Sequence, residues 1–129
     1  MHQTAQYDGN SGDLGAARQL TAEFLARLAK ELFVIVTERF HGDVLLVVSE
    51  LLTNAVRYAH GPPRVELRGS AQSVVVTVWD SSDALPIMFP PDPARIGGHG
   101  LEIVHRLCAQ VTAERVAAGK RVQAVLRLS

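Results

Sequence analysis

The run from Asp43 to Arg57 places four polar side chains on one narrow stripe of a predicted helix that is otherwise rich in Val, Leu and Ala. With Glu50 at zero and about 100° of rotation per residue, Asn54 lies at about 40°, and Asp43 and Arg57 lie within about 20° of Glu50. A glutamate can accept a proton, and the amide oxygen of an asparagine can ligate Mg²⁺. The stripe also fits the solvated outer face of a helix, and the spacing E-x-x-x-N is weak evidence by itself.

A second candidate is Asp80, which follows Trp79 at the end of a Val-rich segment. A carboxylate at the point where a buried strand emerges can accept a hydrogen bond from an exocyclic amine such as that of adenine. An aspartate that ends a strand by accepting bonds from the turn amides of Ser81 and Ser82 is an ordinary alternative. Both explanations stay open from the residues alone.

A third candidate is the glycine cluster Gly97-Gly98-His99-Gly100, which precedes an apolar segment with helical spacing. Glycines permit close backbone approach and positive φ, while a helix N-terminus presents free N–H groups and about half a positive charge. Together these features are typical of a phosphate-binding site. The alternative is a flexible hinge with a glycine-assisted helix start, although three glycines in four positions exceed what a cap requires.

Apolar periodicity predicts the helices that must position these residues. Asp13 is a candidate cap for a first helix and Thr37 for a second one. Because Gly42 costs about 1 kcal/mol in a helix relative to alanine, we expect the second helix to begin nearer Asp43. The short apolar run over 33–36 fits either a strand or a buried connection.

Alternating apolar residues predict a hairpin over 64–68 and 73–80, a helix after the glycine cluster, and a second hairpin over 111–116 and 122–128. Residues 81–96 contain four prolines and predict a long loop. Hairpins separated by helices indicate an α+β two-layer sandwich with an antiparallel or mixed sheet. The chain has no GxxxxGK[ST] segment, which excludes the P-loop NTPases.

The bulk composition restricts the classes of function. The chain has 129 residues, a formal net charge of zero and 5% aromatic residues, which disfavours nucleic-acid binding by a basic face or by base stacking. No apolar run approaches the roughly 20 residues of a membrane span, and the single Cys108 predicts a reducing, cytoplasmic compartment. We expect residues 1–12 to be a flexible lead-in and residues 13–129 to form one domain.

Taken in order, three segments resemble the motifs of the GHKL (histidine kinase-like) ATPase superfamily: 49–59, 78–82 and 97–104. Within that superfamily, the chain is similar to the short stand-alone serine/threonine kinases of the bacterial anti-sigma-factor type. The likeness extends from about Asp13 to the end of the chain. It implies a Bergerat fold, in which helices pack on one face of a mixed, mainly antiparallel sheet and ATP lies between the helices and a lid formed by residues 81–96.

The resemblance also implies a role for each matching residue. Glu50 would be the general base that activates the attacking hydroxyl, Asn54 would hold Mg²⁺ against the phosphates, and Asp80 would bond the adenine amine. The phosphates would be framed by residues at the start of the third helix and by a basic side chain of the second, although a solvated arginine fits the last position equally well: Gly98, His99, Gly100, Leu101 and Arg57.

The chain departs from the superfamily pattern at two places that would surround the base. Where many relatives read D-x-G-x-G, this chain reads Asp80-Ser81-Ser82-Asp83-Ala84 and lacks both glycines. In the final hairpin, Gly119-Lys120-Arg121 stands where a G-T-like pair often helps to seat adenine.

By this resemblance, the expected function is that of an ATP- and Mg²⁺-dependent protein kinase that binds a sigma factor and phosphorylates a small anti-sigma antagonist on Ser or Thr. Relatives are often dimers, but the sequence leaves open whether this chain forms a homodimer. From the composition, we expect no direct contact with nucleic acid or membrane. One alternative is a non-catalytic module that binds ATP and sequesters a partner. Another is a plain α+β interaction domain without a nucleotide.

Overall fold

The structure is a computed structural model of the whole chain, which describes residues 1–7, 12–58, 62–81, 100–117 and 119–128, with the backbone alone for 57, 58 and 100. Its described part contains eight elements in chain order: β1 (His2–Gln6), α1 (Asp13–Leu32), α2 (Glu38–Tyr58), β2 (Arg64–Gly69), β3 (Ser73–Asp80), α3 (Gly100–Leu107), β4 (Gln110–Val116) and β5 (Gly119–Arg127).

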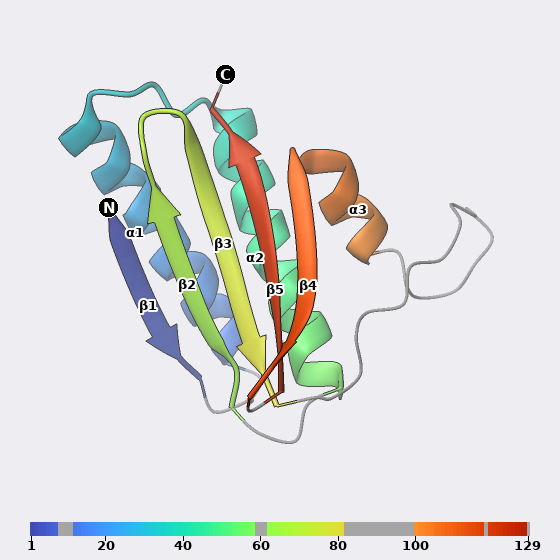
Figure 1. Cartoon of the computed structure of the whole chain (residues 1–129). Coiled ribbons are helices and arrows are strands. Elements are labelled where there is room, and N and C mark those ends of the chain that lie inside the picture. The colour runs from blue at the N-terminus through green and yellow to red at the C-terminus, as the bar shows by residue number, and fades with distance from the viewer. Residues whose placement is uncertain (8–11, 59–61, 82–99, 118, 129) are drawn as a thin grey trace.

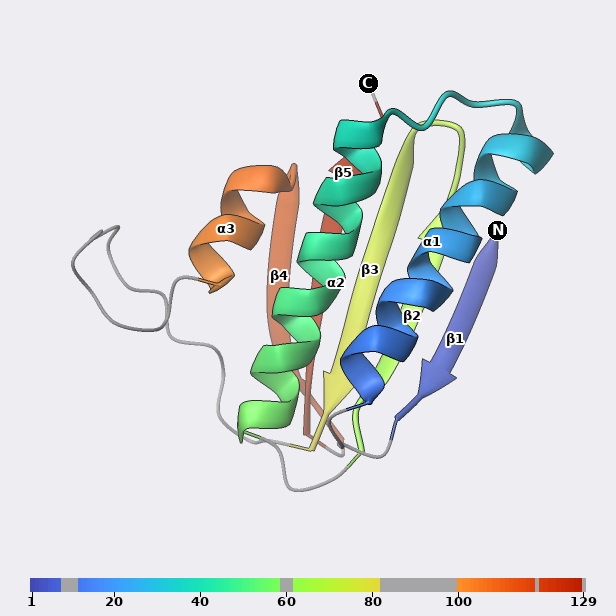
Figure 2. The same ribbon diagram turned by 180° about the vertical axis from the view of Figure 1, so that it is seen from behind.

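The five strands form one sheet in the order β1-β2-β3-β5-β4, and each neighbouring pair is antiparallel. All three helices lie on the same face of this sheet, as the two opposite views show (Figures 1 and 2). The α+β two-layer sandwich predicted from the order of hairpins and helices is therefore confirmed. Among the described residues, no helix is both long enough and apolar enough to cross a membrane.

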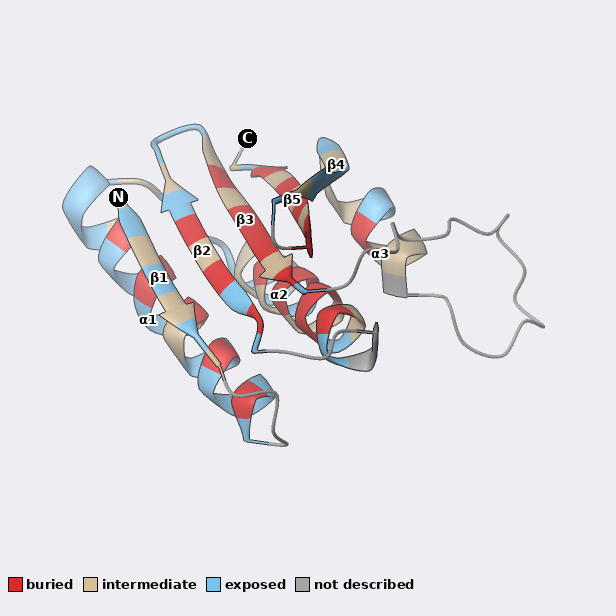
Figure 3. Cartoon of the chain, turned by 60° about the horizontal axis from the view of Figure 1, so that its bottom comes forward, coloured by how far each residue is buried: buried red, intermediate tan, exposed pale blue. Residues whose placement is uncertain are grey.

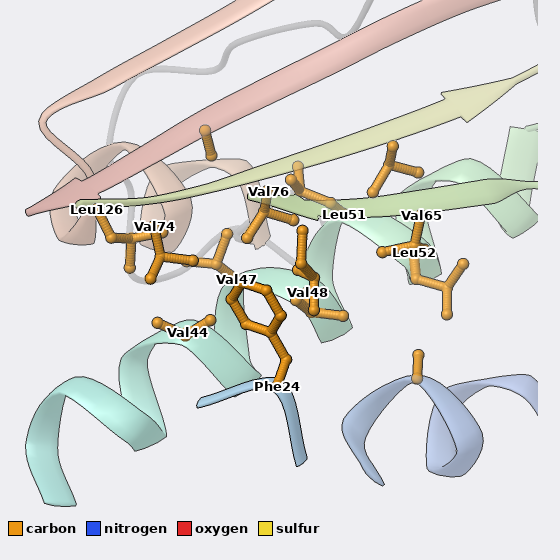
Figure 4. Packing of buried hydrophobic residues seen from close by; sticks show 14 of the residues in the cluster. Phe24, Val44, Val47, Val48, Leu51, Leu52, Val65, Val74, Val76 and Leu126 are labelled. Atoms are coloured by element: carbon orange, nitrogen blue, oxygen red, sulfur yellow. The ribbon is translucent and has the colours of Figure 1, made fainter. Parts of the chain in front are cut away.

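The core fills the space between the sheet and the two long helices. The residues of β2, β3 and β5 that turn towards the helices recur at every second position and are buried (Figure 3). They are apolar except for Asp80 at the end of β3 and Lys120 near the start of β5. Helix α2 contributes side chains at intervals of three and four residues, and Figure 4 shows them packed with Phe24 of α1 against the sheet. The α2 residues that are buried in this core are Val44, Val47, Val48, Leu51, Leu52 and Ala55.

Helix α2 begins earlier than predicted. Its first residue is Glu38, not one near Asp43, and Gly42 lies inside the helix. The predicted cap is confirmed, because the Thr37 hydroxyl oxygen accepts a hydrogen bond of 3.1 Å from the backbone N–H of Phe40. This cap and the packing of Phe40 against the core outweigh the modest helix penalty of one exposed glycine.

Two further predictions near the N-terminus need correction. Residues His2–Gln6 are not a flexible lead-in but form the edge strand β1, with Gln3 and Ala5 turned towards the helices. The strand's polar residues hide its period-2 pattern, and its backbone pairing with β2 holds it in place. Asp13 is the first residue of α1 and not its cap, because the N-cap is Gly12 and no side chain caps this end.

The ambiguous run over 33–36 is a connection between α1 and α2 and not a strand. Phe33 has a left-handed backbone conformation at the end of α1. Val34 and Val36 pack against the core, whereas Phe33 and Ile35 are 93% and 85% exposed.

Candidate functional site

Asp80 is the last residue of β3, and it turns towards the helices. It follows Val74, Val76 and Val78 on the same face of the sheet, and it is 6% exposed. Trp79 points to the opposite face, where the Arg64 guanidinium lies 4.0 Å from its ring centroid. Of Trp79 and Asp80, only Asp80 therefore lies on the face of the sheet that the helices cover. A ligand between the sheet and the helices could contact only this side chain of the two.

The carboxylate of Asp80 forms a buried ion pair that the sequence analysis did not predict. The register of β3 against β5 pairs Asp80 with Lys120, and the Lys120 Nζ lies 3.4 Å from the Asp80 Oδ2. The two side chains are only 1% and 2% exposed. An isolated charge at either position would be costly, and the opposite charge beside it compensates this cost.

Gly119 explains how β5 comes so close to Asp80. Its φ is +148°, a conformation that side-chain-bearing residues rarely adopt. A Cβ placed there would lie 1.9 Å from the backbone oxygen of Asp80 and 2.7 Å from the Cα of Ser81. The backbone conformation therefore requires glycine at position 119. Because Gly119 has no side chain, β5 can approach β3 closely enough for Lys120 to pair with the carboxylate of Asp80.

Glu50 and Asn54 are half-buried on α2, at the border of the core-facing side. Asp43 lies about 20° from Glu50 around the axis of α2, so the surroundings of Asp43 show which side of the helix this stripe faces. The charge of Asp43 contributes to raising the pKa of Cys108, the residue that follows α3, so this stripe of α2 turns towards α3. Among the residues that the structure describes, no side-chain hydrogen bond or ion pair is found for Glu50 or Asn54.

Burial is the larger cause of the shift at Cys108, and together with the charge of Asp43 it raises the pKa of this thiol to about 11. The free thiol therefore stays protonated and unreactive at neutral pH, since the thiolate is the nucleophile. Cys108 lies beside the site as a packing residue and contributes no chemistry to it.

The remaining predicted site residues are only partly described. Gly100 is the first residue of α3 and Leu101 is half-buried against the core, as a helix beginning after the glycine cluster predicts. The backbone of Arg57 belongs to α2, but its side chain lies outside the described residues, as do Gly98, His99 and the segment 82–99 that contains most of the predicted lid.

The candidate site residues that the structure describes lie towards one end of the molecule. Helix α2 and strand β3 both end there and β5 begins there, at the bottom of Figure 1, while α3 packs beside α2 and β4. A buried acceptor, Asp80, thus lies at the same end of the sheet as the half-buried Asn54 near the end of α2. Asp80 thus offers a hydrogen-bond acceptor at the end of β3. Glu50 and Asn54 offer a carboxylate and an amide on α2.

The candidate site was also searched for groups of side chains that could ligate a metal ion. Within the described ranges, no group of three or more His, Cys, Asp or Glu side chains could hold a metal ion. Mg²⁺ commonly keeps several waters and takes only one or two protein ligands plus phosphate oxygens. Asn54 carries an amide oxygen, which is a ligand type that Mg²⁺ accepts.

A scan against protein-family models matches residues 11–126 to the histidine kinase-like ATPase domain. The chain therefore belongs to this ATPase family, in agreement with its α+β two-layer fold. A search of curated proteins finds no match. Family membership supports an ATP-binding regulatory function and, because the family includes kinases, an ATP-dependent kinase activity in general terms.

Proposed function

We propose that this protein is an ATP-dependent serine/threonine kinase of the anti-sigma-factor type. The observation that carries the proposal is the pairing of two features within one histidine kinase-like ATPase domain. Asp80 offers a buried acceptor for adenine at the end of β3, and Glu50 with Asn54 offers a carboxylate and an amide on the flank of α2 that turns towards α3.

The proposed reaction assigns one step to each residue. The hydroxyl oxygen of a Ser or Thr on the protein substrate attacks the γ-phosphorus, and the bond between this phosphorus and the bridging oxygen of ADP breaks. Glu50 accepts the hydroxyl proton, for which its half-buried position leaves it accessible. Asn54 would hold a Mg²⁺ ion against the phosphates, and this ion would neutralise part of their charge.

The protein partners rest on the sequence resemblance. A sigma factor would be bound directly, and a small anti-sigma antagonist would be the phosphoacceptor, both in the cytoplasm. A second copy of the chain would complete a homodimer. The rival function is a partner-sequestering module in which ATP binds without transfer of its phosphate.

Nucleotide binding is tested first, by thermal unfolding with and without Mg-ATP at millimolar concentration. Ligand at 100 times its Kd stabilises a protein by about 2.7 kcal/mol. For a chain of this length we expect the Tm to rise by about 10 °C, because the unfolding entropy is about 2.1 cal/mol/K per residue. A Tm unchanged at this concentration would refute ATP binding and leave the plain interaction domain.

Catalysis is tested with Glu50→Gln, and with Glu31→Gln on the exposed surface of α1 as the matched control. Removal of a general base slows transfer by about 10²- to 10⁴-fold while the side-chain shape is kept. The acceptor would come from a pull-down in Mg-ADP and in Mg-ATP, followed by mapping of phosphorylated Ser and Thr. If ATP binds and Glu50→Gln transfers phosphate as fast as the control, Glu50 is not the general base. If ATP binds and the unaltered protein transfers phosphate to none of the captured proteins, the sequestering module is the better account.

A further inference from the structure

The face of the sheet opposite the helices, here called the open face, is covered by no described helix or strand. It is turned towards the viewer in Figure 1, with the helices behind it. On β1, β2 and β4 the side chains of this face are polar or charged, as is usual for the solvated face of an antiparallel sheet. The two strands between them, β3 and β5, do not follow this pattern.

The open face has an apolar centre. Val75 of β3 is paired in register with Val125 of β5, and both are half-buried although no described helix lies above them. Trp79 lies on the same face, four residues further along β3. Because the other face of β3 lies in the core, this strand is apolar on both sides, a pattern typical of strands that are buried on both faces. The sequence of β3 therefore indicates that its open face is covered by a partner.

Charged side chains lie on both sides of this apolar centre. On β2, Arg64 lies over Trp79, with its guanidinium carbon 4.0 Å from the ring centroid. On β4, Glu114 forms an ion pair with Arg121 of β5, and the Glu114 side chain is still 54% exposed. The register places four side chains in one row across the open face, in the order Arg64, Trp79, Arg121 and Glu114. An apolar centre with Trp and Arg inside a polar rim is the usual composition of a protein–protein interface.

The order of the charges in this row fits a second copy of the same chain. A two-fold axis parallel to the strands, between β3 and β5, places β2 of each copy opposite β4 of the other. Arg64 then faces Glu114 of the second copy, and the two-fold symmetry makes this contact twice. The same axis places Val75 opposite Val125 of the second copy. Sheets that pack face to face lie about 10 Å apart, which lets such side chains meet.

A two-fold axis across the strands does not fit the charges. With such an axis at Thr77, the middle of the face, Arg64 would lie opposite Arg68 of the second copy. Glu114 would lie opposite the uncharged Gln110. Like charges that face each other across an interface weaken association, whereas opposite charges favour it. The charge pattern therefore selects the axis parallel to the strands.

We propose that the open face is a homodimer interface, in which β3 of each copy packs against β5 of the other. The candidate nucleotide site lies on the helix-covered side of the sheet, so the interface leaves it uncovered in both copies. This inference rests on the proposed function only for the expectation of a second copy, to which it assigns a surface. It requires neither ATP binding nor phosphate transfer.

The first test is sedimentation equilibrium of the unaltered protein in buffer without nucleotide. We expect the mass of two chains. If the mass remains that of one chain at about 0.3 mM, the proposal is overturned, because an interface of standard size associates well below this concentration.

The centre of the interface is tested with Val125→Lys, which adds two ammonium groups between the sheets of a dimer. Thr4→Lys is the matched control, because it adds the same charge on the same face of the sheet. In the proposed arrangement, β4 of the second copy covers β2, so the edge strand β1 lies outside the contact. We expect the Kd of the dimer to rise at least about 100-fold in Val125→Lys and less than about threefold in the control. A dimer that survives Val125→Lys shows that another surface joins the copies.

The direction of the axis is tested by exchange of charges between β2 and β4. Arg64→Glu and Glu114→Arg each place like charges opposite each other at both contacts, so we expect each variant alone to dimerise more weakly. Mixed in equal amounts, they form a heterodimer in which both contacts again join opposite charges, and we expect association to return. The matched controls Arg39→Glu and Glu31→Arg are exposed on the helices; each should dimerise alone and gain nothing from mixing. If mixing the open-face variants, each shown by circular dichroism to be folded, does not restore association, the proposed interface is wrong.

The outcomes separate this proposal from the kinase function. If the unaltered protein is a monomer and Mg-ATP raises its Tm, only the interface is wrong. If the dimer responds to these variants as expected and Mg-ATP leaves its Tm unchanged, the interface is supported and the ATP-dependent function is refuted.

Discussion

Removing the ammonium of Lys120 leaves the carboxylate of Asp80 buried without its opposite charge, and this should destabilise the folded protein even when no nucleotide is present. Both side chains are almost fully shielded from solvent. Breaking a buried ion pair by removal of one partner costs about 3 to 5 kcal/mol. With an unfolding entropy of about 2.1 cal/mol/K per residue, we expect the Tm of Lys120→Met to fall by about 11 to 19 °C.

The double variant Asp80→Asn/Lys120→Met separates the loss of pairing from the loss of packing. It buries no charge, so its main penalty is an amide with incomplete hydrogen bonds, about 1 to 3 kcal/mol. We therefore expect it to be more stable than either single variant. In a double-mutant cycle, this non-additivity measures the interaction between the two side chains.

The assay is urea unfolding followed by far-UV circular dichroism, in buffer without nucleotide. Lys30→Met, which removes an exposed lysine in the last turn of α1, is the control. A substitution at an exposed position changes stability by no more than about 0.5 kcal/mol. The reasoning is refuted if Lys120→Met costs less than about 1 kcal/mol, or if the double variant costs as much as the two single variants together.

Three further predictions concern single residues. Gly42→Ala should raise the free energy of unfolding by up to about 1 kcal/mol in urea unfolding. Gly42 lies inside α2, and an added Cβ would meet no atom within 4 Å other than the neighbouring backbone of the helix. A loss of stability would contradict the helix geometry there. Gly119→Ala should destabilise strongly, by at least about 2 kcal/mol in the same assay, because the new Cβ would overlap the backbone of Asp80 in a conformation reserved for glycine; an unaffected midpoint would show that β5 is placed differently. The pKa of Cys108, raised to about 11, predicts that iodoacetamide alkylates the native thiol roughly 100-fold more slowly at pH 8 than the thiol of the urea-unfolded chain. Because the folded state holds this proton more tightly than the unfolded state, the thiol's contribution to stability is complete below pH 9 and is lost as the pH rises towards 11; a Cys108→Ala variant should lack this alkaline loss.

The parts of the fold that the sequence predicted are those governed by local patterns. The alternating valines of β3 and the apolar spacing of α2 identify a strand and a helix without reference to the rest of the chain. Strand β1 was not predicted because its side chains are mostly polar, and its backbone pairing with β2 cannot be inferred from the local sequence. The low helix propensity of Gly42 predicts a start of α2 near Asp43, but the cap at Thr37 sets the start at Glu38.

The candidate site shows the same division. Residue type and spacing within single elements are enough to propose Asp80, Glu50 and Asn54 as candidates. The partnership of Asp80 with Lys120 was not, because β3 and β5 are far apart in sequence and their register is set by tertiary packing. Gly119 carried the available signal, a glycine that opens the strand facing Asp80, but its positive φ is a property of the folded backbone.

The strand order has a consequence for synthesis on the ribosome. Strand β5 lies inside the sheet, between β3 and β4, although it is the last element of the chain. A nascent chain that has emerged only as far as β4 can pair β1, β2 and β3, but one edge of β3 remains without its neighbour. Such an exposed edge invites association with other chains. We therefore expect cotranslational folding to halt at a three-stranded intermediate until Arg127 has left the exit tunnel. Only then can β5 pair with β3 and place Lys120 beside Asp80.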